Sequence, residues 1–247
     1  MEKEQLNIAR IADKIRKYEK TGEICHTAFL DPTEALEAKN MVRKIANVFC
    51  GGYEEAERKI LIIGTDEKEV VGEYMELLTI ELLTIEKNKK MSHREVLGSL
   101  LGLGITRDVI GDIIIKDSRA DVFVLKEISK YIIQNLQKVG KEKVKIYINS
   151  YENLISIEDL SKEIKTTVAS LRLDAIISVA IGISREVSAK MIQNQKVKLN
   201  HKIIENTSKQ IKTGDKISVR GYGRIELVEV LGETKKDRIR VILKKTT

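Results

Sequence analysis

Residues 171–247 constrain the fold of this chain most strongly, because helical and strand periodicities follow one another there within a short distance. Apolar residues recur at helical spacing over 173–180, and Gly182 stands where a helix C-terminus favours a residue that tolerates positive φ. Ser184 is a typical N-cap for a second helix. Over 196–200 polar and apolar residues alternate, which indicates a half-buried strand. The pattern predicts two short, steeply packed helices followed by strands.

Turn and strand signals continue to the end of the chain. The Gly-Asp pair at 214–215 marks a turn, after which polar and apolar residues alternate again over 216–220. The sequence Gly-Tyr-Gly-Arg at 221–224 predicts a tight basic loop, and a last strand is expected around Ile239.

The positive charge of the chain is confined to this C-terminal part. Residues 171–247 hold 17 Lys and Arg against 8 Asp and Glu, a net charge of +9, whereas residues 1–170 hold 27 against 29, a net charge of −2. A positive field on one domain favours a polyphosphate partner, because each neutralised phosphate releases condensed counterions. The alternative is a lysine-rich surface that is simply solvated.

The polar and basic residues of the predicted helices and loops are the candidate RNA contacts. If Val187 and Met191 bury one side of the second helix, Arg185 projects into solvent beside Lys196 and Lys198, where its forked guanidinium can engage phosphate. The full set of expected RNA-binding residues is Arg172, Ser184, Arg185, Lys190, Lys196, Lys198, Asn200, Lys202, Lys209, Arg220, Tyr222 and Arg224.

The runs at 172–200 and 214–220, including Arg-Leu-Asp at the first helix and Lys-Val-Lys-Leu-Asn at the strand, resemble the S-four RNA-binding domain, also called the alpha-L motif. Two residues depart from that pattern, since Gln195 and His201 stand where the domain usually has glycine. A non-glycine residue held at positive φ costs roughly 1 kcal/mol, so these two turns are expected to be reshaped.

Three further blocks, at 51–58, 92–104 and 220–224, make the chain similar to the bacterial YlmH family. This resemblance implies a non-enzymatic protein that binds structured rRNA, and possibly tRNA, on the large ribosomal subunit. It also implies a role in ribosome-associated quality control on subunits that carry peptidyl-tRNA. A link to bacterial cell division is a weaker implication of the same resemblance.

The first 76 residues predict a mostly helical α/β domain. An apolar stripe over 6–15 indicates one helix, and a second is expected to begin at the Asp31 cap, with Glu34 closing a capping box. The helical spacing is expected to continue to Cys50, and a short apolar strand follows at 60–63.

The middle of the chain predicts the order strand, helix, strand, strand, helix, strand. The expected strands are 78–85, 110–115, 121–125 and 144–148, and the expected helices run from Ser92 to Gly102 and over 126–138. This is the ferredoxin-like plan that RNA-recognition modules share. The whole chain is therefore predicted to be α+β, with an N-terminal domain at 1–76, a ferredoxin-like, RRM-like domain at 77–163 and an alpha-L RNA-binding domain at 170–247.

The middle domain lacks the exposed aromatic residues on which such modules stack bases. Phe123 is the one clear aromatic candidate on an inner strand, so base stacking is not favoured. The resemblance nevertheless implies RNA contact by this domain. Contact with phosphate and RNA shape would have to come from the loop and helix start that hold Lys87, Lys89, Lys90, His93 and Arg94.

The alternative function is an RNA-modifying enzyme of pseudouridine synthase or methyltransferase type, with an active site within residues 20–110 and the C-terminal domain as its substrate grip. The tripeptide at 172–174 is similar to that of pseudouridine synthases, but it opens an RNA-binding helix here. The glycines at 98–104 lie within and after a helix rather than between a strand and a helix, as a cofactor loop requires. No catalytic residue is therefore assigned.

Composition excludes several other classes of protein. Cys25 and Cys50 fit no metal spacing and no disulfide framework, so buried free thiols are expected, and the adjacent Cys25 and His26 are not favoured as a catalytic pair. No stretch approaches the roughly 20 apolar residues of a membrane span, and the charged start is not that of a signal peptide. We expect a cytoplasmic monomer with no metal, no cofactor and no membrane partner.

Overall fold

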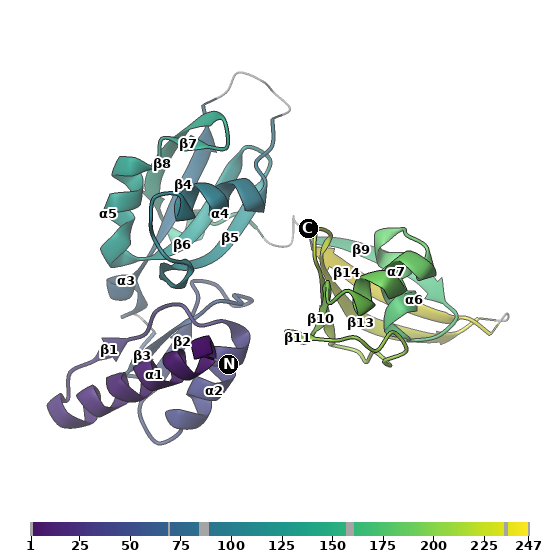
Figure 1. The fold of residues 1–247 in the computed structure, drawn as a ribbon, viewed down its shortest axis with the longest axis horizontal. Helices are drawn as coiled ribbons and strands as arrows, with labels where there is room; N and C mark the ends of the chain where they lie inside the picture. Colours follow the sequence, from purple (N-terminus) through teal and green to yellow (C-terminus); the bar gives the residue numbers. More distant parts are fainter. Residues whose placement is uncertain (1, 69, 84–88, 157–160, 235–236, 247) are drawn as a thin grey trace. The chain divides into compact units, whose positions relative to one another are not determined.

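The computed structural model describes residues 2–68, 70–83, 89–156, 161–234 and 237–246. The chain forms two compact units, Met1–Ile155 and Ser156–Thr247. The first unit contains an N-terminal region and a middle region, and the second contains the basic C-terminal part of the sequence (Figure 1).

The N-terminal region packs two helices against a small antiparallel sheet. The core between them contains Ile11, Ala38, Leu61 and Ile63. The predicted capping box is present, since the Asp31 carboxylate accepts from the backbone of Glu34 and the Glu34 carboxylate accepts from the backbone of Asp31. The elements are α1 (Glu2–Thr21), β1 (Cys25–His26), α2 (Pro32–Met41), β2 (Asn47–Cys50) and β3 (Ile60–Ile63), with the strand order β1-β3-β2.

The prediction that the second helix continues to Cys50 is wrong. Helix α2 ends at Met41, and residues 47–50 form β2, which pairs with the completely buried strand β3. The Asn47 side chain donates to the carbonyls of Val42 (3.2 Å) and Ile45 (2.7 Å), which closes the turn after the helix. Pairing with a strand distant in the sequence therefore outweighs the local helical spacing.

The middle region has the predicted order of elements, with one short α-helix and one short strand that were not predicted, around a five-stranded antiparallel sheet. Its capping box at Ser92 and Glu95 is also present. The sheet has the order β5-β6-β4-β8-β7. The elements are α3 (Val71–Tyr74), β4 (Met75–Leu82), α4 (His93–Leu101), η1 (Arg107–Val109), β5 (Ile110–Lys116), β6 (Arg119–Leu125), α5 (Lys126–Asn135), β7 (Lys138–Val139), β8 (Glu142–Asn149) and η2 (Tyr151–Asn153). The predicted end of the first strand, Ile85, lies outside the described residues.

The two faces of this sheet have different surroundings. Helices α4 and α5 cover one face through a core that includes Ile80 and Val122 (Figure 1). On the other face Phe123 is fully buried and lies between the rings of Tyr53 (centroids 5.7 Å apart) and Tyr151 (5.9 Å). Part of this second face is therefore covered, and Phe123 cannot stack on a nucleic-acid base.

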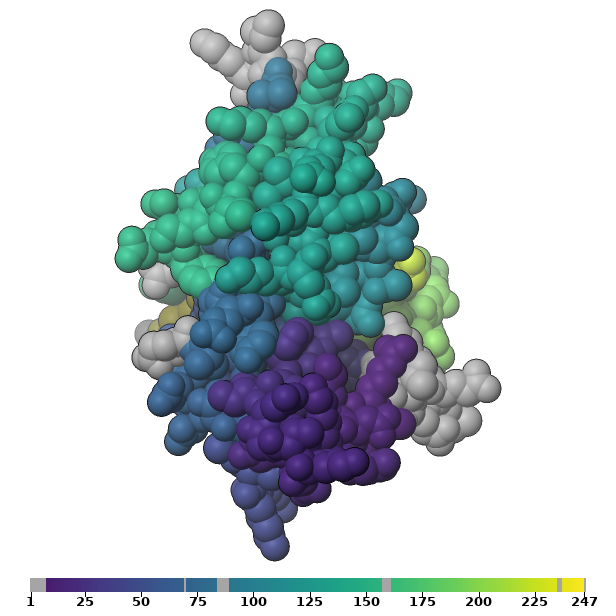
Figure 2. Space-filling model, turned by 90° about the vertical axis from the view of Figure 1, so that its left-hand side faces the viewer, coloured from purple at the N-terminus to yellow at the C-terminus, as the bar shows by residue number. Residues whose placement is uncertain are grey.

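The N-terminal region supplies part of the cover over Phe123 through Tyr53, and in the space-filling view it packs directly against the middle region (Figure 2). A polar joint fixes the contact. The Asp112 carboxylate accepts from the Tyr53 hydroxyl (2.8 Å) and from the backbone N–H of Glu57 (2.7 Å) and Arg58 (3.1 Å). The Arg58 guanidinium donates to the carbonyls of Phe29 (2.7 Å) and Ile110 (3.0 Å). The bonds to Asp112 and Ile110 join segments that are 52 to 59 residues apart within one unit.

The C-terminal unit places two helices on one face of a six-stranded antiparallel sheet. Gly182 ends the first helix with φ of 76°, and the Ser184 hydroxyl caps the second, both as predicted. The strand order is β11-β10-β12-β13-β14-β9. The elements are β9 (Ser161–Val168), α6 (Leu173–Ile181), α7 (Arg185–Gln193), β10 (Val197–Leu199), β11 (Lys202–Ile203), β12 (Lys216–Val219), β13 (Gly223–Glu233) and β14 (Ile239–Thr246).

The boundary expected between 163 and 170 does not match the sheet. Strand β9 pairs with β14 along its whole length, from Ser161 opposite Thr246 to Val168 opposite Ile239, and it belongs to the C-terminal unit. This edge strand is rich in Lys and Thr and buries only Val168 fully, so it gives little of the alternating signal that identifies a strand. The C-terminal unit therefore begins near Ser156 rather than at residue 170.

Candidate RNA interface

An arginine pair held by one buried carboxylate lies where the two C-terminal helices meet. Arg172, at the N-cap of α6, donates to both oxygens of Asp174 (3.1 Å each), and Arg185, the first residue of α7, donates to Oδ2 of Asp174 (2.9 Å). Burial of Asp174 opposes its ionisation, but the hydrogen bonds from the two arginines outweigh it, so the pKa of this carboxyl is lowered. The cluster keeps one positive charge in excess with both guanidinium groups oriented.

The sequence predicts that Arg185 extends toward Lys196 and Lys198. This prediction is wrong, because the Arg185 guanidinium binds Asp174 instead. The prediction that Val187 is buried is also wrong, since its side chain is 44 % exposed. The buried side of α7 instead contains Ile192 and Ser188, whose hydroxyl donates to the carbonyl of Asp174 (2.9 Å). The Arg185 side chain is still half-exposed, so its guanidinium can contact an anion. The neighbouring cation at that position is Arg172 rather than a lysine of the strand.

A loop between β11 and β12 connects this arginine pair to the other end of α7. The backbone carbonyls of Lys209 and Thr207 accept from the N–H groups of Leu173 (2.9 Å) and Asp174 (3.2 Å). At its other end the Glu205 carboxylate accepts from the Gln195 side chain (2.6 Å). This loop places Lys209 next to the arginine pair.

A second group of candidate residues gathers where β10 and β12 meet. The Arg220 N–H donates to the carbonyl of Lys196 (2.9 Å), so these two exposed cations are neighbours. Tyr222 follows in the turn and is 39 % exposed. On the sheet face away from the helices, Lys198 and Arg224 both lie opposite Ser218 on β12. These positions agree with the predicted basic strand and basic loop.

Besides Arg172 and Arg185, three more of the expected RNA contacts have structural partners. The Asn200 side chain donates to Asp215 (2.8 Å) and accepts from the Lys216 N–H (2.9 Å), so it holds the turn after β10. Lys190 forms an exposed ion pair with Glu186 (2.7 Å), one helical turn away. Ser184 caps α7, while Lys202 is exposed on β11.

Gln195 and His201 both lie in the left-handed region of backbone conformation, which favours glycine. Their φ values are 56° and 69°, and Asn200 next to His201 has φ of 47°. The sequence therefore keeps the left-handed turns while replacing glycine. A strain of roughly 1 kcal/mol at each position is the expected consequence.

The cations expected to make the middle region bind RNA are in large part neutralised. Lys89 pairs with Glu142 (3.0 Å), and Lys90 pairs with Asp117 (2.9 Å). Loss of hydration and the charge of Arg107 lower the pKa of His93, so its imidazole is neutral near pH 7. Arg94 is exposed at the start of α4, and Lys87 lies outside the described residues.

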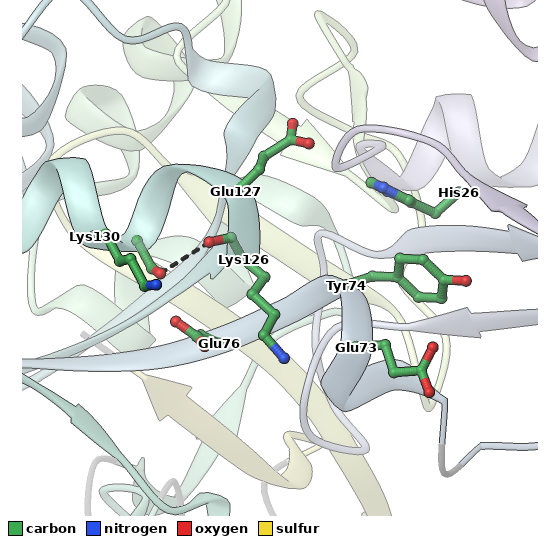
Figure 3. A pocket seen from close by; sticks show the side chains of 8 residues that line it. His26, Glu73, Tyr74, Glu76, Lys126, Glu127 and Lys130 are labelled. Atoms are coloured by element: carbon green, nitrogen blue, oxygen red, sulfur yellow. Dashed lines mark hydrogen bonds between the residues drawn. The ribbon is translucent and has the colours of Figure 1, made fainter.

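A pocket of about 390 Å³ lies in the first unit between the N-terminal and middle regions (Figure 3). The His26 ring faces the Tyr74 ring (centroids 4.7 Å apart) on one side, and side chains of α5 form the other. The Ser129 hydroxyl donates to the carbonyl of Lys126 (2.9 Å) rather than to a catalytic base. The lining is His26, Glu73, Tyr74, Glu76, Lys126, Glu127, Ser129 and Lys130.

The two cysteines are free, but only one is buried. Cys25 is buried, its pKa is raised by burial, and its thiol is directed at the carbonyl of Lys14 (3.5 Å). His26 is directed at the carbonyl of Thr27 (3.0 Å), so the adjacent residues do not form a nucleophile and base. Cys50 is half-buried, which corrects the prediction that both thiols are buried.

The fold and the arginine pair define a basic RNA-binding module joined to a two-region N-terminal unit. Sequence comparison finds the same division: residues 3–68 match the family model "YlmH, N-terminal", residues 73–153 match "Putative RNA-binding domain in YlmH", and residues 171–217 match "S4 domain". The chain belongs to the YlmH family, as its resemblance indicated.

Two relatives illustrate this membership. The chain is 34 % identical over 218 residues to "Ribosome-associated protein quality control protein P2" of Bacillus subtilis (strain 168). The matched region covers 87 % of this chain and 84 % of the relative. The structure of "Cell division protein ylmH from Streptococcus pneumoniae" has the same fold over 62 % of this chain and 95 % of its own, with a TM-score of 0.55 and 20 % identity. No helix in the described part of the chain is long and apolar enough to cross a membrane.

Proposed function

We propose that the protein is a non-enzymatic RNA-binding factor whose C-terminal unit grips the phosphate backbone of structured RNA. The observation that supports this most strongly is the Arg172–Asp174–Arg185 cluster. Two guanidinium groups share one buried carboxylate, which orients them for phosphate while leaving a positive charge in excess. The other proposed contacts are Ser184, Lys190, Lys196, Lys198, Lys202, Lys209, Arg220, Tyr222 and Arg224, with Asn200 shaping the turn that presents them.

The RNA is proposed to be structured rRNA, with tRNA as a further ligand, on the large ribosomal subunit. This step rests on the Bacillus subtilis relative, whose name places that protein in ribosome-associated quality control. Because the match extends over 84 % of the relative, we infer that the N-terminal, middle and C-terminal parts of this chain serve in the same process. We infer that the protein acts in quality control of translation in the cytoplasm as a monomer.

The middle region is proposed to be a ferredoxin-like domain that serves as scaffold and secondary RNA contact. Its strand-helix-strand-strand-helix-strand order and the central position of β4 and β6 in an antiparallel sheet support this. The RNA-modifying alternative gains no support from the Ser129 and Cys25 contacts. New modified nucleosides in RNA incubated with the protein and a methyl donor, or new pseudouridine in RNA incubated with the protein alone, would revive that alternative.

Binding to a structured RNA should weaken steeply as salt rises. Each phosphate neutralised on a duplex should contribute roughly 0.9 to the slope of log K against log salt, because counterions are released. Filter binding of the full chain to an RNA hairpin and to a single-stranded homopolymer from about 50 to 300 mM salt measures this slope. A flat dependence, or a preference for the unpaired homopolymer, would contradict the phosphate grip.

A further inference from the structure

The half of the middle sheet that the N-terminal region leaves uncovered carries a lysine-rich surface. Side chains alternate between the two faces of a sheet, and Ala120, Ile80 and Val144 belong to the core under α4 and α5, so their neighbours along the strands point the other way. The register brings these neighbours together: Lys116 lies opposite Arg119, and Glu81 lies between Arg119 and Lys145. We call this surface the distal sheet face; it comprises Glu81, Lys116, Arg119, Lys138, Lys143, Lys145 and Tyr147.

Positive charge is concentrated on the distal sheet face. Residues 1–155 as a whole hold 25 Lys and Arg against 26 Asp and Glu, a net charge of −1. Among the described residues, this face holds four lysines and one arginine against Glu81 and the buried Asp121, which binds Arg119 through two hydrogen bonds. This face therefore carries an excess of three positive charges within a unit that is nearly neutral.

One pairing on this face is unfavourable without an anion. Lys138 and Lys143 lie directly opposite each other on β7 and β8, an arrangement of like charges that destabilises a sheet. The Glu81 carboxylate accepts from the Tyr147 hydroxyl (2.9 Å), while the Lys145 ammonium lies over the Tyr147 ring, 5.3 Å from its centroid. Lys145 thus packs against an aromatic ring whose hydroxyl is held by Glu81.

We propose that the distal sheet face is a second RNA-binding site that contacts the phosphate backbone. Five strands at about 4.8 Å spacing span roughly 19 Å, which is enough for several successive phosphates. Protein interfaces usually centre on apolar and aromatic side chains, whereas the described part of this face centres on Arg119, Glu81 and Lys145 and has one exposed apolar residue, Leu83, at its margin. This composition fits a polyphosphate.

The geometry also limits how this site reads RNA. Phe123 is covered, and Lys145 occupies the exposed face of Tyr147, so bases are not offered a free stacking platform. Recognition is therefore by backbone and shape, with little sequence preference. The site rests on the proposed function, and it adds a contact to the grip of the C-terminal unit.

A charge-neutralising variant of the full chain tests the site. The variant K138Q/K143Q/K145Q removes three exposed lysines from the distal sheet face. The control K20Q/K39Q/K44Q removes three exposed lysines from the N-terminal helices and the turn that follows, with the same change in net charge. Filter binding of both to a structured RNA, across a range of salt, gives affinity and salt slope. We expect the first variant to bind roughly 5- to 20-fold more weakly, with a salt slope lower by about 2 to 3, and the control to change less than about twofold.

The outcomes separate this site from the main proposal. Normal affinity and an unchanged slope for the first variant, or equal loss in both variants, would overturn the second site while leaving the C-terminal grip intact. No RNA binding by the parent chain would overturn both. An RNase-resistant association of the parent with a ribosomal protein that is lost only in the first variant would show a protein partner on this face instead of RNA. Equal melting temperatures for all three chains would show that folding is not the cause.

Discussion

Replacement of Gly52 by alanine is expected to lower the free energy of unfolding of the first unit by about 2 to 4 kcal/mol, combining backbone strain with overpacking. Gly52 has φ of 96°, and a Cβ built there would lie 2.0 Å from Cε1 of Phe123. Phe123 cannot move aside readily, because it is fully buried between the rings of Tyr53 and Tyr151. The substitution therefore strains the joint between the N-terminal and middle regions.

Urea unfolding followed by circular dichroism measures this effect, and Gly22 provides the control. Gly22 also has positive φ, of 70°, but a Cβ there would have no neighbour within 4 Å. Gly22→Ala should cost about 1 kcal/mol from the backbone alone. If the two variants lost the same stability, Phe123 would not be packed against Gly52 as the structure shows.

Replacement of Arg185 by alanine is expected to weaken RNA binding by about 1 to 3 kcal/mol, with little dependence on RNA sequence. The loss has two parts. The half-exposed guanidinium that would face phosphate is removed, and the one positive charge that the cluster has in excess is lost, because Arg172 and Asp174 then balance each other. Arg172→Ala should act in the same direction for the same reason.

Co-sedimentation with large ribosomal subunits, together with melting temperatures, measures this prediction. Arg185→Lys is the informative partner variant, because it keeps the charge but not the fork that binds Asp174 and an anion together, and it should restore only part of the binding. Lys165→Ala is the control, since Lys165 lies exposed on the edge strand β9 in an ion pair with Glu163. Normal binding by Arg185→Ala would show that the arginine pair has a structural role only. A loss of binding that is accompanied by a much lower melting temperature would show the same.

Local signals in the sequence were sufficient for much of the fold. Gly182 and Ser184 mark the joint between α6 and α7, and the two capping boxes mark the starts of α2 and α4, because each signal acts within a few residues. The misplaced elements depend on distant partners. Strand β2 exists because it pairs with β3, and β9 exists because it pairs with β14.

In the candidate site, too, the sequence predicted the local features and missed those that depend on distant partners. Residue types and charge located the basic C-terminal surface, but they did not reveal which side chains have partners. Arg185 binds Asp174, and the Asn200 amide holds a turn, since both partners come from other elements. The lysines of the distal sheet face were missed because they are spread from residue 116 to residue 145 and come together only through the strand register.

The most direct test of the main claim is the affinity of the two compact units for RNA, measured separately. A fragment of residues 156–247 retains β9 and the whole C-terminal sheet, and residues 1–155 retain the other unit. Gel shifts with structured rRNA should show that residues 156–247 bind within about 20-fold of the full chain, while residues 1–155 bind at least tenfold more weakly than residues 156–247, given their net charge of −1. Tight binding by residues 1–155, with none by a folded fragment of residues 156–247, would contradict the assignment of the C-terminal unit as the main RNA grip.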